Sequence, residues 1–159
     1  MAMKFMGAAI MVADVARSRQ FYEGLLGQAV EMDNGPHVAF AGGFSIWQKD
    51  HAHEVIFGGP EAGAQAMGRA NLELYFESET LEQDCQALAV AGVEVIHGLT
   101  EAPWAQMTAR FKDPDGHIVE LAEPLPLVVR RLLGQGLSLE DVARRTSMDV
   151  AIVRYMAEQ

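Results

Sequence analysis

A single carboxylate placed just after a tight turn is the feature of this sequence best suited to chemistry. Glu120 follows the turn Asp113–His117 (DPDGH) and lies in an apolar run that is typical of a strand. On a strand Glu120 shares a face with Ile118 and Ala122, so it points into whatever the sheet encloses. There it can bind a metal ion, act as a general base with a raised pKa, or accept hydrogen bonds from a ligand. A residue held by hydrogen bonds without a function is the remaining interpretation.

A second predicted strand offers polar side chains on one face. Its polar residues are Asn71, Glu73 and Tyr75, which alternate with Leu72, Leu74 and Phe76. This period of two is typical of a strand with one solvated and one packed face. If the solvated face lines a cleft, the three polar side chains contact a ligand beside Glu120. The alternative is a face that points to solvent.

Aromatic and imidazole side chains are further candidates. Trp47 and Trp104 are large enough to stack on a ligand, although each also suits a core position. Gln48 follows Trp47 and offers an amide to the same ligand. His51 and His53 form a pair that has no third metal ligand nearby, so we expect both to face solvent.

The composition is that of an ordinary globular chain. It has 159 residues, half of them apolar, and no apolar run close to the roughly 20 residues that span a membrane. Cys85 is the only cysteine, which excludes an intramolecular disulfide and a cysteine-rich zinc site. A formal net charge of −10 disfavours nucleic acid and anionic membranes as partners. No secretory signal is visible at the start, so we expect a cytoplasmic protein.

A strand–helix–strand pattern occurs twice and predicts an α+β fold of two βαβββ units within a domain at residues 1–123. The first unit, residues 4–48, should contain strands at 5–12, 29–32, 37–41 and 44–48, and a helix that runs from the cap Asp14 to residue 26. The second unit, residues 71–123, should contain strands at 71–76, 93–96, 107–111 and 118–122, and a helix at 79–91. Residues 49–70 show no sustained period and are predicted to be a connector.

Residues 124–159 form a helical extension in this prediction. Short helices are expected at 127–133, 139–146 and 150–157. The last two resemble a helix-turn-helix, but the second offers only Arg154 to base edges and begins at Asp149, which phosphate would repel. We therefore favour an element that caps the domain or joins a dimer.

Two motifs resemble the vicinal oxygen chelate superfamily, which includes glyoxalase I, bleomycin and fosfomycin resistance proteins and extradiol dioxygenases. The first runs from Asp14 to Tyr22 (DVARSRQFY) and continues with Leu25-Leu26-Gly27; the second is the DPDGH turn followed by Glu120. The resemblance covers roughly residues 4–123. It implies that the two units form a half-barrel cleft, often completed by a second subunit, where a divalent metal polarises vicinal oxygens of a substrate. It also implies a homodimer.

The resemblance places four metal-ligand positions in this chain, but only one carries a suitable side chain. The positions are Gly7, Ile46 or Trp47, Asn71 and Glu120. Gln48 would coordinate weakly and only after a shift of register. One carboxylate holds a divalent ion too weakly to retain it, so we expect neither metal nor other cofactor. A shifted ligand set, in which Glu73 meets Glu120, keeps a divalent metal as the alternative.

These observations predict a glyoxalase- or bleomycin-resistance-like protein that binds a small molecule in its cleft without the metal of the family. Glu120 is the candidate catalytic residue if the protein is an enzyme, which the sequence does not decide. One alternative is a metal-dependent lyase or dioxygenase with the shifted ligand set. Another is a ligand-responsive regulator that binds DNA through the helical extension.

Overall fold

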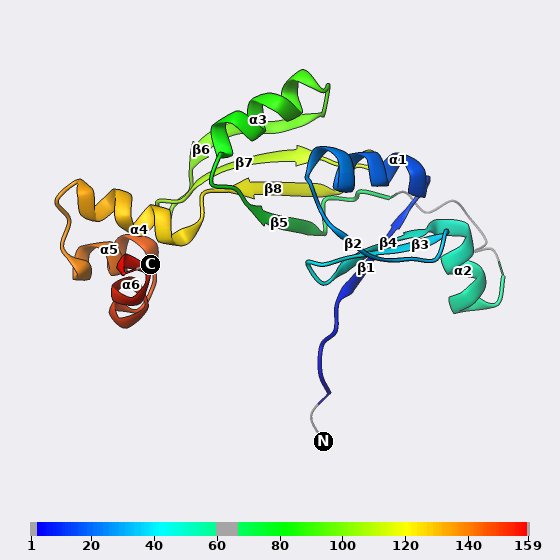
Figure 1. Ribbon diagram of the computed structural model, residues 1–159, viewed down its shortest axis with the longest axis horizontal. Helices are drawn as coiled ribbons and strands as arrows, with labels where there is room; N and C mark the ends of the chain where they lie inside the picture. The colour runs from blue at the N-terminus through cyan, green and yellow to red at the C-terminus, as the bar shows by residue number, and fades with distance from the viewer. Residues whose placement is uncertain (1–2, 60–66, 159) are drawn as a thin grey trace. The chain divides into compact units, whose positions relative to one another are not determined.

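The structure, a computed structural model, describes residues 3–59 and 67–158. Its contacts divide the chain into two units. Unit 1 comprises residues 1–72 and 113–117, and unit 2 comprises residues 73–112 and 118–159. Each unit contains one four-stranded mixed sheet with helices, and no sheet closes into a barrel in the described part of the chain. The predicted α+β class with two βαβββ units is confirmed (Figure 1).

The sheet of unit 1 has the strand order β1-β4-β3-β2. Its elements are β1 (Ala8–Val12), α1 (Val15–Arg19), the π-helical segment η1 (Gln20–Leu25), β2 (Val30–Asp33), β3 (His37–Phe40), β4 (Phe44–Gln48) and α2 (Lys49–Phe57). β1 pairs with β4 in parallel, and the other pairs are antiparallel. The core of the unit includes Tyr22, whose ring lies against Phe21, Phe40 and Phe44.

The predicted cap of the first helix is confirmed, although the helix is not uniform. Asp14 accepts a hydrogen bond from the Arg17 amide at 3.1 Å. The backbone then widens into η1, and the Leu26 amide closes it with a bond to the Phe21 carbonyl at 3.0 Å. Gly27 follows with a φ of 62°, which glycine adopts without strain. The sequence therefore predicts where this helical segment starts and ends, but no feature of the sequence indicates its π-helical form.

The segment that we predicted to be a connector contains a helix, α2, and this difference has a simple cause. Only Ala52 of α2 is buried, so the helix has no apolar stripe to produce a period of 3.6 residues. It ends at Gly58, which has a φ of 76° and donates to the Glu54 carbonyl. Residues 60–66 of the predicted connector lie outside the described residues.

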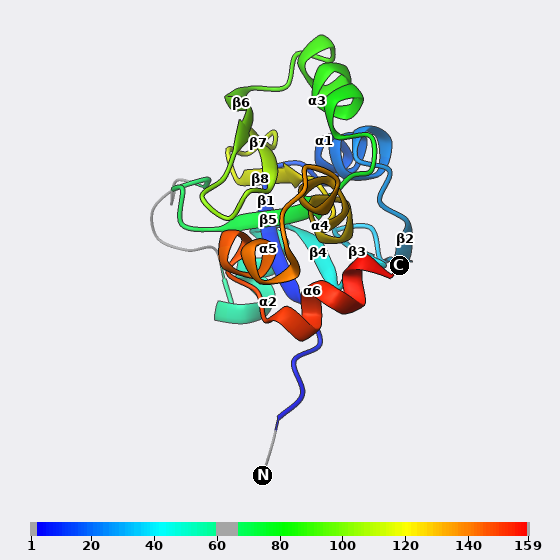
Figure 2. The same ribbon diagram turned by 90° about the vertical axis from the view of Figure 1, so that its left-hand side faces the viewer.

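The sheet of unit 2 repeats this topology in the order β5-β8-β7-β6. Its strands are β5 (Glu73–Glu77), β6 (Val95–Glu101), β7 (Met107–Lys112) and β8 (Ile118–Ala122), and its helices are α3 (Leu81–Val90), α4 (Leu125–Gly134), α5 (Leu139–Thr146) and α6 (Val150–Ala157). β5 pairs with β8 in parallel. Figures 1 and 2 both show α3 on one side of this sheet.

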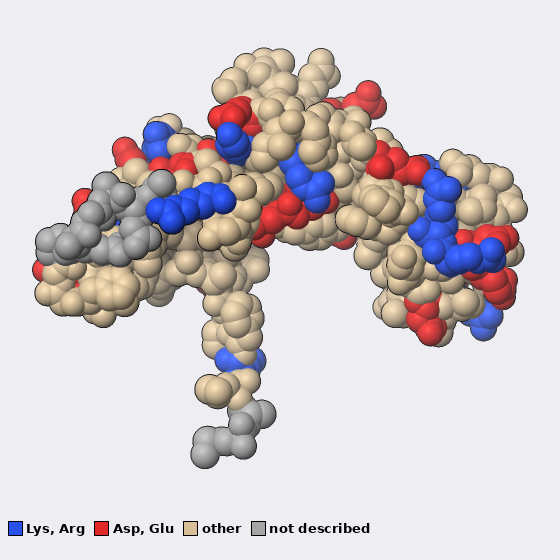
Figure 3. Space-filling model, turned by 180° about the vertical axis from the view of Figure 1, so that it is seen from behind, with Lys and Arg blue, Asp and Glu red and all other residues tan. Residues whose placement is uncertain are grey.

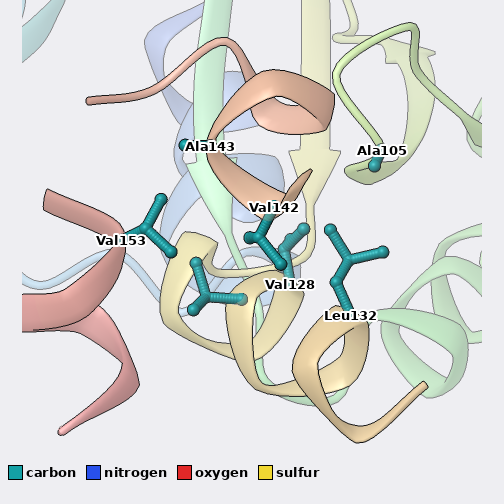
Figure 4. Packing of buried hydrophobic residues seen from close by; sticks show 7 residues of the cluster. Ala105, Val128, Leu132, Val142, Ala143 and Val153 are labelled. Carbon is teal, nitrogen blue, oxygen red and sulfur yellow. The ribbon is translucent and has the colours of Figure 1, made fainter. Parts of the chain in front are cut away.

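The three C-terminal helices share an apolar cluster. Val128 and Leu132 of α4, Val142 of α5 and Val153 of α6 point toward one another (Figure 4). The cluster also includes Ala105, from the loop between β6 and β7. Arg131 of α4 ties the helices to the rest of unit 2, because it donates to the Ala105 carbonyl at 2.7 Å and pairs with Glu123 at 2.8 Å. These contacts support the packing role that we favoured for the extension.

The two helices of the helix-turn-helix resemblance are present, and DNA binding by them stays a prediction. α5 and α6 are joined by a short turn in which Ser147 is left-handed, and Asp149 caps α6. The exposed side of α6 includes Ile152 and Tyr155. On the face in Figure 3, Lys and Arg of these helices, seen at the right, lie beside Asp and Glu.

No helix in residues 3–59 and 67–158 is both long and apolar enough to span a membrane.

Candidate functional site

A row of polar residues crosses all four strands of the unit 2 sheet. Strand pairing aligns Tyr75 of β5 with Glu120 of β8, Glu120 with Arg110 of β7, and Arg110 with His97 of β6. Residues paired in this way project from the same face of a sheet. Glu73 lies two residues before Tyr75 and shares that face. The opposite face is apolar, with Val119, Leu121 and Phe111 buried.

Glu120 is the buried centre of this row, as the sequence predicted. Its side chain is only 4% exposed, and its Oε2 accepts a hydrogen bond from Arg110 Nη2 at 2.7 Å. Glu120 Oε1 is buried and has no hydrogen-bond partner in the described protein. Since an unsatisfied buried oxygen of a carboxylate is costly, this atom is the strongest indication of a functional site.

Arg110 brings the two predicted carboxylates together. Its Nε donates to Glu73 Oε2 at 2.9 Å, while Nη2 binds Glu120. His97 Nδ1 lies 2.9 Å from the Gly98 carbonyl, which requires it to donate, so His97 Nε2 accepts from Arg110 Nη1 at 3.2 Å. One guanidinium therefore connects three side chains of the row.

The two carboxyl groups differ in their affinity for a proton. Burial raises the pKa of Glu120 to about 7, and the neighbouring Glu73 carboxylate adds to this increase more than Arg110 opposes it. The pKa of Glu73 is lowered, mainly by its hydrogen bond with Arg110 and then by the neighbouring Glu120 carboxyl group. Of the two groups, Glu120 is therefore the one that takes up a proton first as the pH falls.

Arg110 and His97 were not among the residues predicted from the sequence. An arginine in a strand is usually predicted to be exposed to solvent. Its partners depend on the register between strands, which a single sequence does not reveal. A general signal was nevertheless present. A carboxylate predicted to be buried requires a cationic or hydrogen-bonding partner, and Arg110 lies on the same face of a neighbouring strand.

Tyr75 and Trp104 belong to a second network in unit 2. Gln106 Nε2 donates to the Tyr75 hydroxyl at 2.8 Å, and Trp104 Nε1 donates to Gln106 Oε1 at 2.8 Å. The Tyr75 hydroxyl in turn donates to Glu77 at 2.7 Å. Tyr75 and Trp104 are both exposed by more than a third, so their aromatic faces are accessible to a ligand.

Trp47 and Gln48 lie in unit 1 and make separate contacts. Trp47 stacks on His37 and donates to His51 Nδ1 at 2.8 Å. Gln48 accepts from the Val15 amide at 3.1 Å and donates to the Ala13 carbonyl at 2.6 Å. The amide of Gln48 thus holds the start of α1, and its role toward a ligand stays a prediction.

Asn71 precedes β5 rather than opening it, in contrast to the predicted strand boundary. It is exposed and lines a cavity of unit 1, together with His53. His51 is exposed as expected, whereas His53 is half-buried in that cavity. The predicted solvent exposure of the histidine pair is therefore wrong for His53.

The residues at the expected metal-ligand positions do not fit a metal. Gly7 has no side chain, and a Cβ there would lie 2.5 Å from the Gly43 carbonyl oxygen, so no larger residue fits without a shift. Ile46 is fully buried in the core of unit 1. Glu120 already binds a cation, Arg110. No group of three or more metal-binding side chains occurs among the described residues.

The DPDGH turn is held by a buried network in unit 1. Asp113 accepts hydrogen bonds from the Tyr22 hydroxyl at 2.8 Å, from His117 Nδ1 at 2.9 Å and from the His117 amide at 2.8 Å. Asp115 pairs with Arg17 at 2.8 Å, which connects the turn to α1. The two sequence motifs thus bind each other, and His117 supports the turn through its contacts with Asp113.

Two βαβββ units, each with its first and fourth strands parallel, define the fold class of the glyoxalases and their relatives. Residues 5–126 match the family described as the Glyoxalase-like domain, and the chain belongs to this family. The superfamily expected from the two motifs is therefore confirmed. The helical extension lies almost entirely outside the matched residues. None of the curated proteins matches this sequence.

Several solved structures share the fold. A protein of unknown function from Agrobacterium tumefaciens is 36% identical, with a TM-score of 0.71 over 77% of this chain and 95% of that one. A glyoxalase/bleomycin resistance protein/dioxygenase from Nocardioides is 18% identical, with a TM-score of 0.60 over 77% and 85%. A glyoxalase-related enzyme from Fulvimarina pelagi is 21% identical, with a TM-score of 0.61 over 74% and 87%. The last two similarities establish the fold alone.

Proposed function

We propose that this glyoxalase-like protein binds a small polar molecule at the row Tyr75–Glu120–Arg110–His97 without the metal of the family. The observation that carries the proposal is Glu120 Oε1, a buried carboxylate oxygen without a protein donor. A ligand hydroxyl or N–H group would satisfy this oxygen and regain the free energy that its burial costs. The exposed aromatic rings of Tyr75 and Trp104 supply an apolar contact for the body of the ligand.

Glu120 also has the properties of an acid–base group. A side chain with a pKa of about 7 both accepts and donates a proton at neutral pH. If the ligand is a substrate, Glu120 removes a proton from it, and Arg110 stabilises the negative charge that develops nearby. The protein is then a metal-free acid–base enzyme; if no reaction follows, it sequesters or senses the ligand.

Arg110 is the reason to favour this proposal over a metal-dependent lyase or dioxygenase. The Arg110 guanidinium forms ion pairs with Oε2 of Glu120 and with Oε2 of Glu73. These two side chains are the carboxylates of the shifted ligand set. A divalent ion at the same carboxylates would be repelled by the guanidinium, and removing Arg110 from them would break two ion pairs. A homodimer and a cytoplasmic location remain part of the proposal.

The first test is the metal content of protein purified without chelator or affinity-tag metal. The protein is then incubated with nickel, zinc, manganese and iron(II), desalted and measured again. We expect far less than one metal ion per chain in every case. About one tightly held ion per chain would overturn the metal-free proposal.

The second test is a thermal-shift screen of small hydroxylated and carbonyl compounds against three proteins. These are the wild type, Glu120→Gln, and the matched control Glu94→Gln, which changes an exposed glutamate paired with Lys112. Ligands of the site should stabilise the wild type and the control but not Glu120→Gln. Equal stabilisation of all three proteins would place the binding site elsewhere.

A further inference from the structure

The loop between β6 and β7 connects the C-terminal helices to the proposed ligand site. It consists of residues 102–106 and carries Trp104, one of the two aromatic side chains that the proposed function assigns to the body of the ligand. Two side chains hold this loop, Gln106 within it and Arg131 of α4. All these residues lie in unit 2, so their contacts belong to a single unit.

The buried side chain of Gln106 binds three partners. Its Oε1 accepts from Trp104 Nε1 at 2.8 Å, and its Nε2 donates to the Tyr75 hydroxyl at 2.8 Å and to the Glu123 carbonyl at 2.7 Å. An indole N–H can only donate and a carbonyl can only accept, so these partners fix which end of the amide is the oxygen. The Tyr75 hydroxyl consequently accepts from Gln106 and donates to Glu77. Gln106 thus orients both aromatic side chains.

The backbone just before Gln106 is strained. Ala105 has a φ of 65°, a conformation that residues other than glycine seldom adopt and that persists only where the surroundings hold it. The Ala105 amide donates to the Ala102 carbonyl, and the Ala102 amide donates to the Gln106 carbonyl, each at 2.8 Å. Ala105 is fully buried in the apolar cluster of α4, α5 and α6 (Figure 4). The C-terminal helices therefore supply the surroundings that hold this loop.

Arg131 contacts both neighbours of the Gln106 side-chain network. Its Nη2 donates to the carbonyl of Ala105, the residue before Gln106, at 2.7 Å. Its Nε and Nη2 also bind the two carboxylate oxygens of Glu123 at 3.1 and 2.8 Å. Glu123 is the residue whose backbone carbonyl accepts from Gln106. One guanidinium of the extension thus holds the loop and the strand end between which Gln106 lies.

We propose that Gln106 is a positioning residue of the ligand site and that the C-terminal helices hold it in place through Arg131. This inference rests on the proposed function, because it concerns the regulation of the same site. When the contacts of Arg131 are lost, the loop can leave the left-handed conformation at Ala105. The rings of Trp104 and Tyr75 then lose the hydrogen bonds that orient them. Since such coupling is reciprocal, a ligand that contacts both rings also stabilises the packing of the helices.

The first experiment uses the full chain without a ligand. The indole N–H resonances of the two tryptophans are recorded by NMR and assigned with Trp104→Phe. Arg131→Gln should shift the Trp104 resonance and make its exchange with water about five-fold faster, the effect of losing roughly one hydrogen bond. Arg131→Lys, which keeps the charge and a donor, should have an intermediate effect. The matched control Arg144→Gln changes an exposed arginine that pairs with Asp141 within α5, and it should have no effect.

This experiment separates positioning from a merely structural role. Backbone amide spectra check that each variant is folded. A structural role alone would lower the stability of Arg131→Gln but leave the Trp104 resonance and exchange rate of the folded protein unchanged. That result would overturn the inference.

The second experiment measures binding of phenol, which offers a hydroxyl to Glu120 and a ring to Trp104. Gln106→Met and Arg131→Gln should each weaken phenol binding about five-fold, whereas Arg144→Gln should leave it unchanged. Equal affinity in all three variants and the wild type would contradict the coupling. Failure of phenol to bind the wild type would instead count against the proposed function. The two failures are distinct, because the indole measurement decides the positioning role without a ligand.

Discussion

The two units have the same strand topology, but the rows of residues that are paired across their strands carry different side chains. Each sheet runs first, fourth, third, second strand, and each has a register irregularity between its second and third strands. Across the first, fourth and third strands, unit 1 aligns Met11, Trp47 and His37. Unit 2 aligns Tyr75, Glu120 and Arg110 in the corresponding strands.

The comparison separates what the fold provides from what the side chains provide. In unit 1 the ring of Trp47 stacks on that of His37 within the row. The buried acid of this unit, Asp113, lies in the DPDGH turn, and both its carboxylate oxygens accept hydrogen bonds. In unit 2 the buried acid lies in the row itself and retains an unsatisfied oxygen. A repeated backbone therefore does not repeat a site. The acid of unit 1 stabilises structure, and we assign the acid of unit 2 to function.

The largest effect is expected for Asp113→Ala in unit 1. The substitution leaves the Tyr22 hydroxyl and three N–H donors without their acceptor, and it removes the counter-charge of His117. We expect a loss of about 4 kcal/mol in the free energy of unfolding. Urea denaturation measures it, with the exposed Asp50→Ala as control. A loss no larger than that of the control would contradict a structural role for Asp113.

A somewhat smaller effect is expected for Arg110→Met in unit 2. It leaves Glu120 buried without its counter-charge, which should cost about 3 kcal/mol at alkaline pH. The cost should decrease at acidic pH, because protonated Glu120 does not need the guanidinium. Denaturation at both pH values measures this dependence, and repeating it in a Glu120→Gln background isolates the pair. A cost that is equal at both pH values and in both backgrounds would show that Arg110 acts independently of Glu120.

The third prediction concerns how stability depends on pH. The pKa of Glu120 is higher in the folded protein, about 7, than the value of about 4.3 expected in the unfolded chain. The proton on Glu120 therefore contributes stability that is fully present below about pH 4 and is lost as the pH rises through 7. The wild type should lose stability relative to Glu120→Gln across this range. A constant difference between the two proteins would be inconsistent with the raised pKa.

Most of the fold could be predicted from the sequence because its signals are local. The Asp14 cap, the glycine at position 27 and the strand at residues 118–122 each depend on neighbouring residues, and each is found where expected. Helix α2 was not predicted, because Ala52 is its only buried residue and one apolar position does not produce the helical period of 3.6 residues. The helix predicted at 127–133 begins at Leu125, because Pro126 lies in the first turn of α4, where the missing N–H of proline costs nothing.

The candidate site could be predicted only in part. The inward direction of Glu120 follows from the period of a strand, and its proximity to Glu73 was proposed from the same argument. Arg110 and His97 required the register of β6 and β7, which contains irregularities on both sides of His97. The cavity of unit 1 depends on the close approach of Gly68 to the DPDGH turn, a contact between residues distant in sequence. Such contacts have no local signal.

The central claim is that Glu120 is a buried acid–base group and not a metal ligand. The most direct test is a titration of the glutamate side-chain carboxyl carbons by NMR in metal-free wild type and in Glu120→Gln. We predict one carboxyl group that titrates near pH 7 in the wild type and is missing from the variant. A spectrum in which every glutamate titrates near its usual value of about 4.3 would contradict the claim.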